Sequence, residues 1–153
     1  MTGPGTADTP ARPEPGRDAF LGEATALVIR QLPTAVVVAR SDGAIAMANE
    51  RVAEVFGGDG SEGAAALFSG LRWVRADGTV IEDRDRPLAR ALARGEAVVG
   101  DEITALRPDG RPILVRASAT PVRDAGGAVV AAIATFADIS AERDARDART
   151  FLA

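Results

Sequence analysis

Three long apolar runs separated by short, glycine-containing turns fill the second half of the chain, and this pattern restricts the fold most. The runs cover residues 98–106, 112–122 and 128–137, and the turns contain Asp109-Gly110 and Gly126-Gly127. Such turns join antiparallel strands, because glycine adopts the backbone conformations that tight hairpins need. The sequence therefore predicts three consecutive antiparallel strands.

The first half of the chain alternates strand and helix signals. Two apolar runs, 35–39 and 44–48, flank an Asp-Gly turn and predict a hairpin. Short helices are predicted from Asn49 to the glycine pair at 57–58, over 64–71, and from Pro87 to Gly95. Asn49 is placed to cap the first of them. Strands and helices in this order indicate an α+β domain.

Four regions follow one another along the chain. Residues 1–17 are rich in proline and glycine, so we expect a disordered tail. Residues 18–32 are predicted to form an amphipathic flanking helix, whose apolar stripe includes Phe20 and Leu27. The domain itself spans 33–140. Residues 141–153 form a second predicted helix, in which Glu142 is spaced to pair with Arg146.

His, Cys, Tyr and Lys are absent from the chain. Their absence excludes Ser-His and Cys-His nucleophiles, zinc sites of thiolate or imidazole, and His or Cys ligands for haem. We therefore expect no catalytic residues. The acids at 82–85 alternate with arginine, and we interpret them as charged surface rather than as a site for a divalent ion.

Net charge and hydropathy restrict the partners. The formal charge of −4 leaves no broad basic surface for a phosphate backbone, so no nucleic-acid partner is expected. No apolar run approaches the roughly 20 residues of a membrane span, and the first residues lack the pattern of a secretory signal. We expect a cytoplasmic protein.

Several local strings resemble the PAS family. They are Leu32-Pro33-Thr34-Ala35, Ala48-Asn49, Arg86-Pro87-Leu88 before Gly95-Glu96, Arg107-Pro108-Asp109-Gly110, Ala119-Thr120-Pro121-Val122 and Asp138-Ile139-Ser140. In order and spacing they cover about residues 32–143. The resemblance implies a PAS fold, in which a five-stranded antiparallel sheet carries short helices on one face and flanking helices at both ends.

The cofactor-binding branches of the family can be compared with this sequence one by one. In the light-sensing LOV branch, the polar flavin contacts fall here on Ala105, Val115 and Phe136, and the required Cys is absent. Apolar side chains make no hydrogen bonds to a flavin ring. The haem branch needs a His, and the yellow-protein branch needs a Cys and a Tyr. No cofactor is therefore expected, although a noncovalently bound flavin or a small apolar ligand remains open.

The resemblance implies a pocket between the inner sheet face and the short helices. Strand alternation sends one set of side chains toward the helices, namely Ile103, Ala105, Val115, Ala117, Ala132, Ala134 and Phe136. The helices and the segment after them offer Leu67, Phe68, Trp73, Leu88 and Leu92. Either a hydrophobic or weakly polar small ligand lies against Trp73 and Phe136, or these side chains simply fill the space.

The end of the domain is the expected output. Asp138, Ile139 and Ser140 resemble the string that ends many PAS domains, and Asp138 either links the core to the last helix or only caps that helix, a role open to Ser140 as well. Ala145, Ala148 and Leu152 form a narrow seam on the helix. Phe151-Leu152-Ala153 is similar to the string before the phosphoacceptor in PAS-containing histidine kinases.

These features predict a sensor module, the input domain of a two-component histidine kinase. It is expected to be a homodimer that acts on a kinase or other effector in cis or in trans and is not itself an enzyme. One alternative is a ligand-free module for dimerisation or partner docking through the helix with Phe20 and Leu27. A third hypothesis is a small carboxylate-based enzyme, which requires Asp101 or Glu102 to face inward.

Overall fold

The computed structural model describes residues 15–58 and 63–152, in two compact units, 1–31 and 32–153. The first unit contains helix α1 (Pro15–Gln31). It begins earlier than the expected residue 18, because proline, which has no N–H to donate, is well suited to the first position of a helix. The tail expected over residues 1–17 is thus wrong for 15–17, and its remainder lies outside the described residues.

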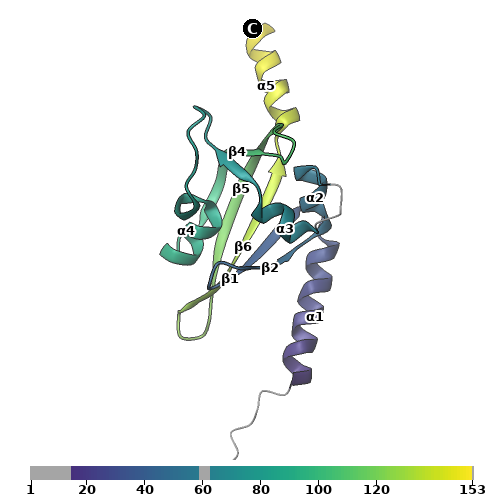
Figure 1. The fold of residues 1–153 in the computed structure, drawn as a ribbon, viewed down its shortest axis with the longest axis vertical. Coiled ribbons are helices and arrows are strands. Elements are labelled where there is room, and N and C mark those ends of the chain that lie inside the picture. The colour runs from purple at the N-terminus through teal and green to yellow at the C-terminus, as the bar shows by residue number, and fades with distance from the viewer. Residues whose placement is uncertain (1–14, 59–62, 153) are drawn as a thin grey trace, which may run out of the picture. The chain divides into compact units, whose positions relative to one another are not determined.

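The second unit combines a six-stranded antiparallel sheet with short helices (Figure 1). Its elements are β1 (Ala35–Arg40), β2 (Ile45–Ala48), α2 (Glu50–Phe56), α3 (Ala64–Ser69), β3 (Arg72–Val74), the 3-10 turn η1 (Asp83–Asp85), α4 (Pro87–Arg94), β4 (Val98–Leu106), β5 (Pro112–Arg123), β6 (Val129–Asp138) and α5 (Ser140–Leu152). The strand order is β2-β1-β6-β5-β4-β3. The expected α+β class, hairpin and three-strand meander are confirmed.

Strand β3 is the one addition to the five expected strands. It pairs antiparallel with β4, so that Trp73 lies opposite Ala105. With only three residues, β3 is too short for alternation of apolar and polar side chains to be visible in the sequence. Its strand conformation comes from pairing with the edge of β4, which is a tertiary contact.

The inner face of the sheet forms the core. All seven side chains that alternation directed inward are buried, with exposures of 2% or less: Ile103, Ala105, Val115, Ala117, Ala132, Ala134 and Phe136. Helix α2 packs on β1 and β6, α3 on β2, and α4 on β5 and β6. Gly57 and Gly95 end α2 and α4 in the left-handed conformation, which glycine adopts without strain.

Asn49 has a different role from the predicted helix cap. It occupies the first position before α2, but its side chain makes no capping hydrogen bond. Its Oδ1 instead accepts from the Val36 backbone N–H at 3.0 Å, and its Nδ2 donates to the Thr34 carbonyl at 2.8 Å. The side chain is buried, where unpaired backbone groups are costly. Asn49 therefore fastens the end of β2 to the beginning of β1.

None of the helices described is both long and apolar enough to cross a membrane.

Candidate functional site

Four aromatic rings form a cluster on the inner face of the sheet. Phe56 comes from α2, Phe68 from α3, Trp73 from β3 and Phe136 from β6. Every ring contacts the other three, with centroid distances from 5.3 Å for Phe68–Phe136 to 6.3 Å for Phe56–Phe68. Most pairs meet edge to face, an arrangement that aromatic quadrupoles favour. The cluster thus joins two helices, α2 and α3, to two strands of the sheet, β3 and β6.

A cavity of about 470 Å³ lies beside this cluster. Three of the rings, Phe68, Trp73 and Phe136, form one wall. The remaining lining comes from Ser69 at the end of α3, from the β1–β2 hairpin and from the segment that includes η1 and α4. The volume is in the range of small-molecule sites, and a mostly apolar lining with a few polar groups is typical of them.

The structure places five of the twelve predicted pocket residues on this cavity, namely Phe68, Trp73, Leu88, Leu92 and Phe136. The other seven are buried in the surrounding core: Leu67, Ile103, Ala105, Val115, Ala117, Ala132 and Ala134. The register explains this division. Ala105 lies opposite Trp73, and Ala117 lies opposite Phe136, so the rings occupy the room that these small side chains leave.

Nine lining residues were not anticipated from the sequence: Ala39, Asp42, Gly43, Ile45, Ser69, Asp83, Arg86, Pro87 and Ala89. The hairpin turn and the start of α4 were each visible as local signals. Their meeting was not, because it depends on β1 pairing with β6 across nearly the whole domain. The cavity is therefore nearer the β1–β2 hairpin than strand alternation alone indicates.

The polar edge of the cavity is formed by Asp83 and Arg86. Arg86 Nη2 and Asp83 Oδ1 are 2.9 Å apart. The Asp83 side chain is 93% exposed, whereas that of Arg86 is only 30% exposed. Nε of Arg86 is buried and makes no hydrogen bond to any described residue. The guanidinium is thus only partly satisfied, and such a buried donor is energetically costly.

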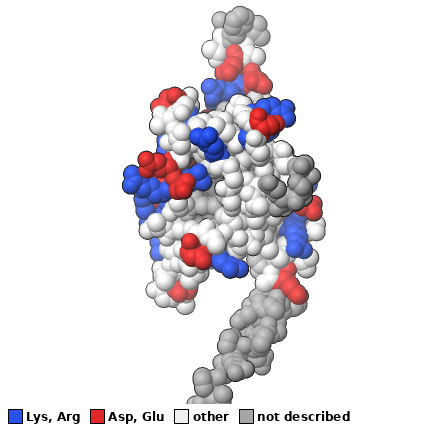
Figure 2. All heavy atoms as spheres, in the orientation of Figure 1, with Lys and Arg blue, Asp and Glu red and all other residues white. Residues whose placement is uncertain are grey.

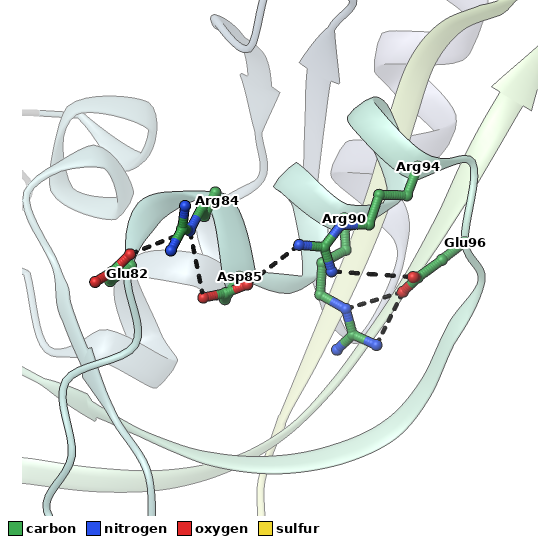
Figure 3. A network of polar contacts seen from close by, with 6 residues as sticks. All are labelled: Glu82, Arg84, Asp85, Arg90, Arg94 and Glu96. Atoms are coloured by element: carbon green, nitrogen blue, oxygen red, sulfur yellow. Dashed lines mark hydrogen bonds and ion pairs between the residues drawn. The ribbon is translucent and has the colours of Figure 1, made fainter.

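A chain of ion pairs borders the same edge (Figure 3). Its links are Glu82–Arg84 at 3.2 Å, Arg84–Asp85 at 3.9 Å, Asp85–Arg94 at 3.3 Å, Arg94–Glu96 at 4.0 Å and Arg90–Glu96 at 2.9 Å. Figure 2 shows these charges gathered over α4. Each exposed pair contributes little, but together they tie η1 and α4 to the start of β4. No cluster of three metal-binding side chains occurs among the described residues.

Hydrogen bonds of Asp138 and of Ile139 hold the junction between β6 and α5 in place. Asp138 Oδ1 accepts a hydrogen bond from the Ser140 backbone N–H at 2.9 Å. The buried Ile139 donates its N–H to the Leu114 carbonyl at 3.1 Å. Asp138 therefore makes a capping contact at the start of α5, and its role in coupling stays a prediction.

Arg116 on β5 joins the sheet to α5. Its guanidinium lies 3.7 Å from Glu102 on β4 and 3.0 Å from Glu142 on α5. The hydrogen bond that Arg116 donates to the Glu142 carboxylate, together with the negative charge of that residue, raises the pKa of Arg116 further above its ordinary value. Glu142 thus binds the sheet rather than the expected Arg146. Side chains of Ala145 and Ala148 are exposed, and that of Leu152 lies outside the described residues.

The residues behind the other two hypotheses can be placed as well. On α1, Leu27 and Val28 are 57% and 60% exposed, while the Phe20 side chain lies outside the described residues. Glu102 is exposed on the outer face of the sheet beside Arg116. Asp101 is partly buried next to a bulge in β4, and neither acid lines the cavity.

Comparison with known proteins gives one family and a set of similar folds. A family model described as PAS domain matches residues 33–141. A search of curated proteins found no match. Three solved structures with similar folds have 16–22% sequence identity to the chain, and two of the three are PAS domains.

The PAS domain of the fruit-fly ELK potassium channel has 16% identity and a TM-score of 0.57, over 79% of this chain and 98% of its own. The PAS domain of a protein from Colwellia psychrerythraea has 18% identity and a TM-score of 0.55, over 78% and 98%. An RNA-binding light-oxygen-voltage receptor has 22% identity and a TM-score of 0.54, over 96% of this chain. The match spans only 39% of that receptor.

Proposed function

The chain belongs to the PAS domain family, and we propose that it is a signal-sensing module in which a small molecule in the cavity changes the attachment of helix α5. PAS domains are generally sensory modules. The cavity supplies a place for a signal, and α5 supplies a route out of the domain. Strand β6 contributes Phe136 to the cavity and is followed directly by α5.

One observation carries this proposal: Phe136 lies on the cavity wall and only two residues before Asp138. Asp138 in turn accepts the N–H of Ser140, where α5 begins. A ligand that contacts Phe136 therefore acts on the strand that holds the helix start. Because a ligand shifts an equilibrium only by binding two states unequally, repacking of the aromatic cluster is the expected difference between them.

The effector is proposed to be a histidine kinase, with this module as its input domain. The exposed Ala145 and Ala148 on α5 offer a small-residue seam for a second helix. The string Phe151-Leu152-Ala153 resembles the approach to a phosphoacceptor. Kinase activity would then belong to a segment or protein outside this chain, and two copies would signal as a dimer.

Trp73 makes the proposal testable, because it is the single tryptophan of the chain and lines the cavity. The full chain would be titrated with octanoate and with 1-octanol, and Trp73 fluorescence would report occupation. Hydrogen exchange over residues 140–152 would report the output. We expect a probe that saturates the fluorescence change to alter exchange in α5. Saturation with unchanged exchange in α5 would refute the coupling.

A ligand-free module for dimerisation or partner docking is the second candidate, and exposed apolar residues on α1 favour it. Leu27 and Val28 are adjacent and more than half exposed, so together they offer an apolar contact for a partner. Light scattering of the chain and of Leu27→Glu tests this candidate. A dimer that dissociates in Leu27→Glu, in a chain that binds neither probe, would favour docking over ligand sensing. Exposed Arg30→Gln on the same helix is the matched control.

A further inference from the structure

The charged residues on the cavity differ in how many of their polar atoms have a hydrogen-bond partner or contact water. Asp42, Asp83 and Arg86 are the charged residues that line it. Asp42 accepts the Ala44 backbone N–H at 2.9 Å, and both acids are exposed and therefore hydrated. The Arg86 side chain is only 30% exposed, and its Nε has no hydrogen-bond partner in the part of the chain that the structure describes. At this edge of the cavity, Arg86 therefore offers a positive charge and a hydrogen-bond donor to a ligand.

The start of helix α4 adds to the same preference. Pro87, Leu88 and Ala89 form its first turn and line the cavity directly after Arg86. Arg86, the N-cap residue of this helix, makes no capping hydrogen bond with its side chain. The N-terminus of a helix carries a partial positive charge, which favours a negative group nearby. Arg86 and the helix start therefore act in the same direction.

Most of the remaining lining of the cavity is apolar. Phe68, Trp73 and Phe136 present ring surfaces, and Leu88 and Leu92 contribute aliphatic ones. At about 470 Å³ the cavity has room for a chain or ring of drug-like size rather than for an inorganic ion alone. A ligand that packs on these apolar side chains and also pairs with Arg86 has an apolar body and one acidic end.

We propose that the cavity selects small amphipathic carboxylic acids, with the carboxylate on Arg86 and the apolar body against Trp73 and Phe136. This inference rests on the proposed function, because it names the ligand class of the same site. The carboxylate takes the place of Asp83. That exchange costs little, since the Asp83 side chain is 93% exposed and such pairs are weak. A planar carboxylate binds two adjacent guanidinium donors at once. Because Nε of Arg86 is buried, the side chain must turn away from Asp83 before a carboxylate in the cavity accepts from both Nε and Nη2.

Three probes with the same alkyl body separate the end group from the body: octanoate, 1-octanol and octylamine. Trp73 fluorescence gives a Kd for each with the full chain. We expect octanoate to bind about tenfold or more tightly than 1-octanol, as a charge-assisted hydrogen bond in a partly buried site predicts. Octylamine is expected to bind no better than 1-octanol.

Two variants assign the preference to Arg86. In Arg86→Gln, octanoate and 1-octanol should bind alike, while Arg84→Gln, which removes a 78% exposed arginine outside the cavity, should keep the preference. Asp83→Asn removes the competing carboxylate and should tighten octanoate binding by about two- to fivefold. Thermal unfolding would verify that each variant is folded.

The outcomes are distinct. Equal Kd values for the three probes, a preference for octylamine, or an unchanged preference in folded Arg86→Gln would overturn the ligand class while the cavity remains a binding site. Weaker octanoate binding in Asp83→Asn would show that Asp83 positions Arg86 rather than competing with the ligand. That result would also overturn the proposal that the ligand carboxylate replaces Asp83 on Arg86. Absence of binding by all three probes would instead remove the proposed ligand sensing itself.

Discussion

Asn49 shows how much one polar side chain contributes when it is buried among apolar ones. Its amide pairs with the Thr34 carbonyl and the Val36 N–H, both at the entrance to β1. Asn49→Ala removes both bonds and leaves buried backbone groups unpaired, so we expect a loss of about 1–3 kcal/mol in the free energy of unfolding. Urea unfolding followed by Trp73 fluorescence measures this loss.

Asn49→Asp is the informative comparison. An ionised carboxylate accepts from Val36 but repels the Thr34 carbonyl, and its burial should raise its folded-state pKa above that of the unfolded chain. The penalty should therefore be small below about pH 4 and grow as pH rises. A loss that does not depend on pH between 4 and 7, measured against the unsubstituted chain, would contradict this account of the site.

Asp138 is expected to matter for the helix rather than for the core. Asp138→Ala removes the acceptor for the Ser140 N–H, a change that costs a helix start about 1 kcal/mol. Hydrogen exchange should rise over the first turns of α5 while the melting temperature of the domain barely changes. Asp138→Asn keeps an acceptor and serves as the control. Equal exchange in the Ala and Asn variants would argue against the capping role.

At the scale of elements, Arg116 is the side-chain link between the sheet and α5. It lies between Glu102 and Glu142, and Arg116→Gln removes both contacts. We expect faster exchange over residues 140–146 and unchanged Trp73 fluorescence, since Arg116 does not line the cavity. High salt should produce the same change in the unsubstituted chain, because these exposed charges are screened.

Arg143→Gln is the matched control for that experiment. Arg143 pairs with Asp147 at 3.6 Å within α5, so its loss removes a charge without cutting a link to the sheet. A similar response in the two variants would mean that local helix charge, and not attachment to β5, determines the order of α5.

The elements that sequence predicted well are those with strong local signals. Turn glycines and alternation located β4, β5 and β6, and Pro87 and Gly95 located α4. Strand β3 and the side-chain role of Asn49 were missed, because both depend on pairing with distant segments. The pocket was predicted from the family resemblance, from strand direction and from the apolar residues of the short helices. The aromatic rings fill the space that strand direction indicated, so the cavity lies nearer the β1–β2 hairpin. No local sequence pattern identified Arg86 as a residue of the cavity.

At the scale of the whole chain, the proposed sensing and the proposed dimerisation fall on different units. The cavity, the four-ring cluster and the β6–α5 junction lie within residues 32–153, whereas Leu27 and Val28 lie within residues 1–31. A chain of residues 32–153 is therefore expected to keep the Trp73 emission spectrum and the octanoate affinity of the full chain. Fluorescence titration measures both.

The same truncated chain should differ from the full chain in assembly. If α1 provides the dimer contact through Leu27 and Val28, light scattering should show a monomer for residues 32–153 and a dimer for the full chain. Retained octanoate binding in a monomer would separate ligand recognition from dimerisation. A truncated chain that stays dimeric would place the interface on the sheet or on α5 instead. Lost binding in a folded monomer would show that ligand recognition requires residues 1–31 or the dimer.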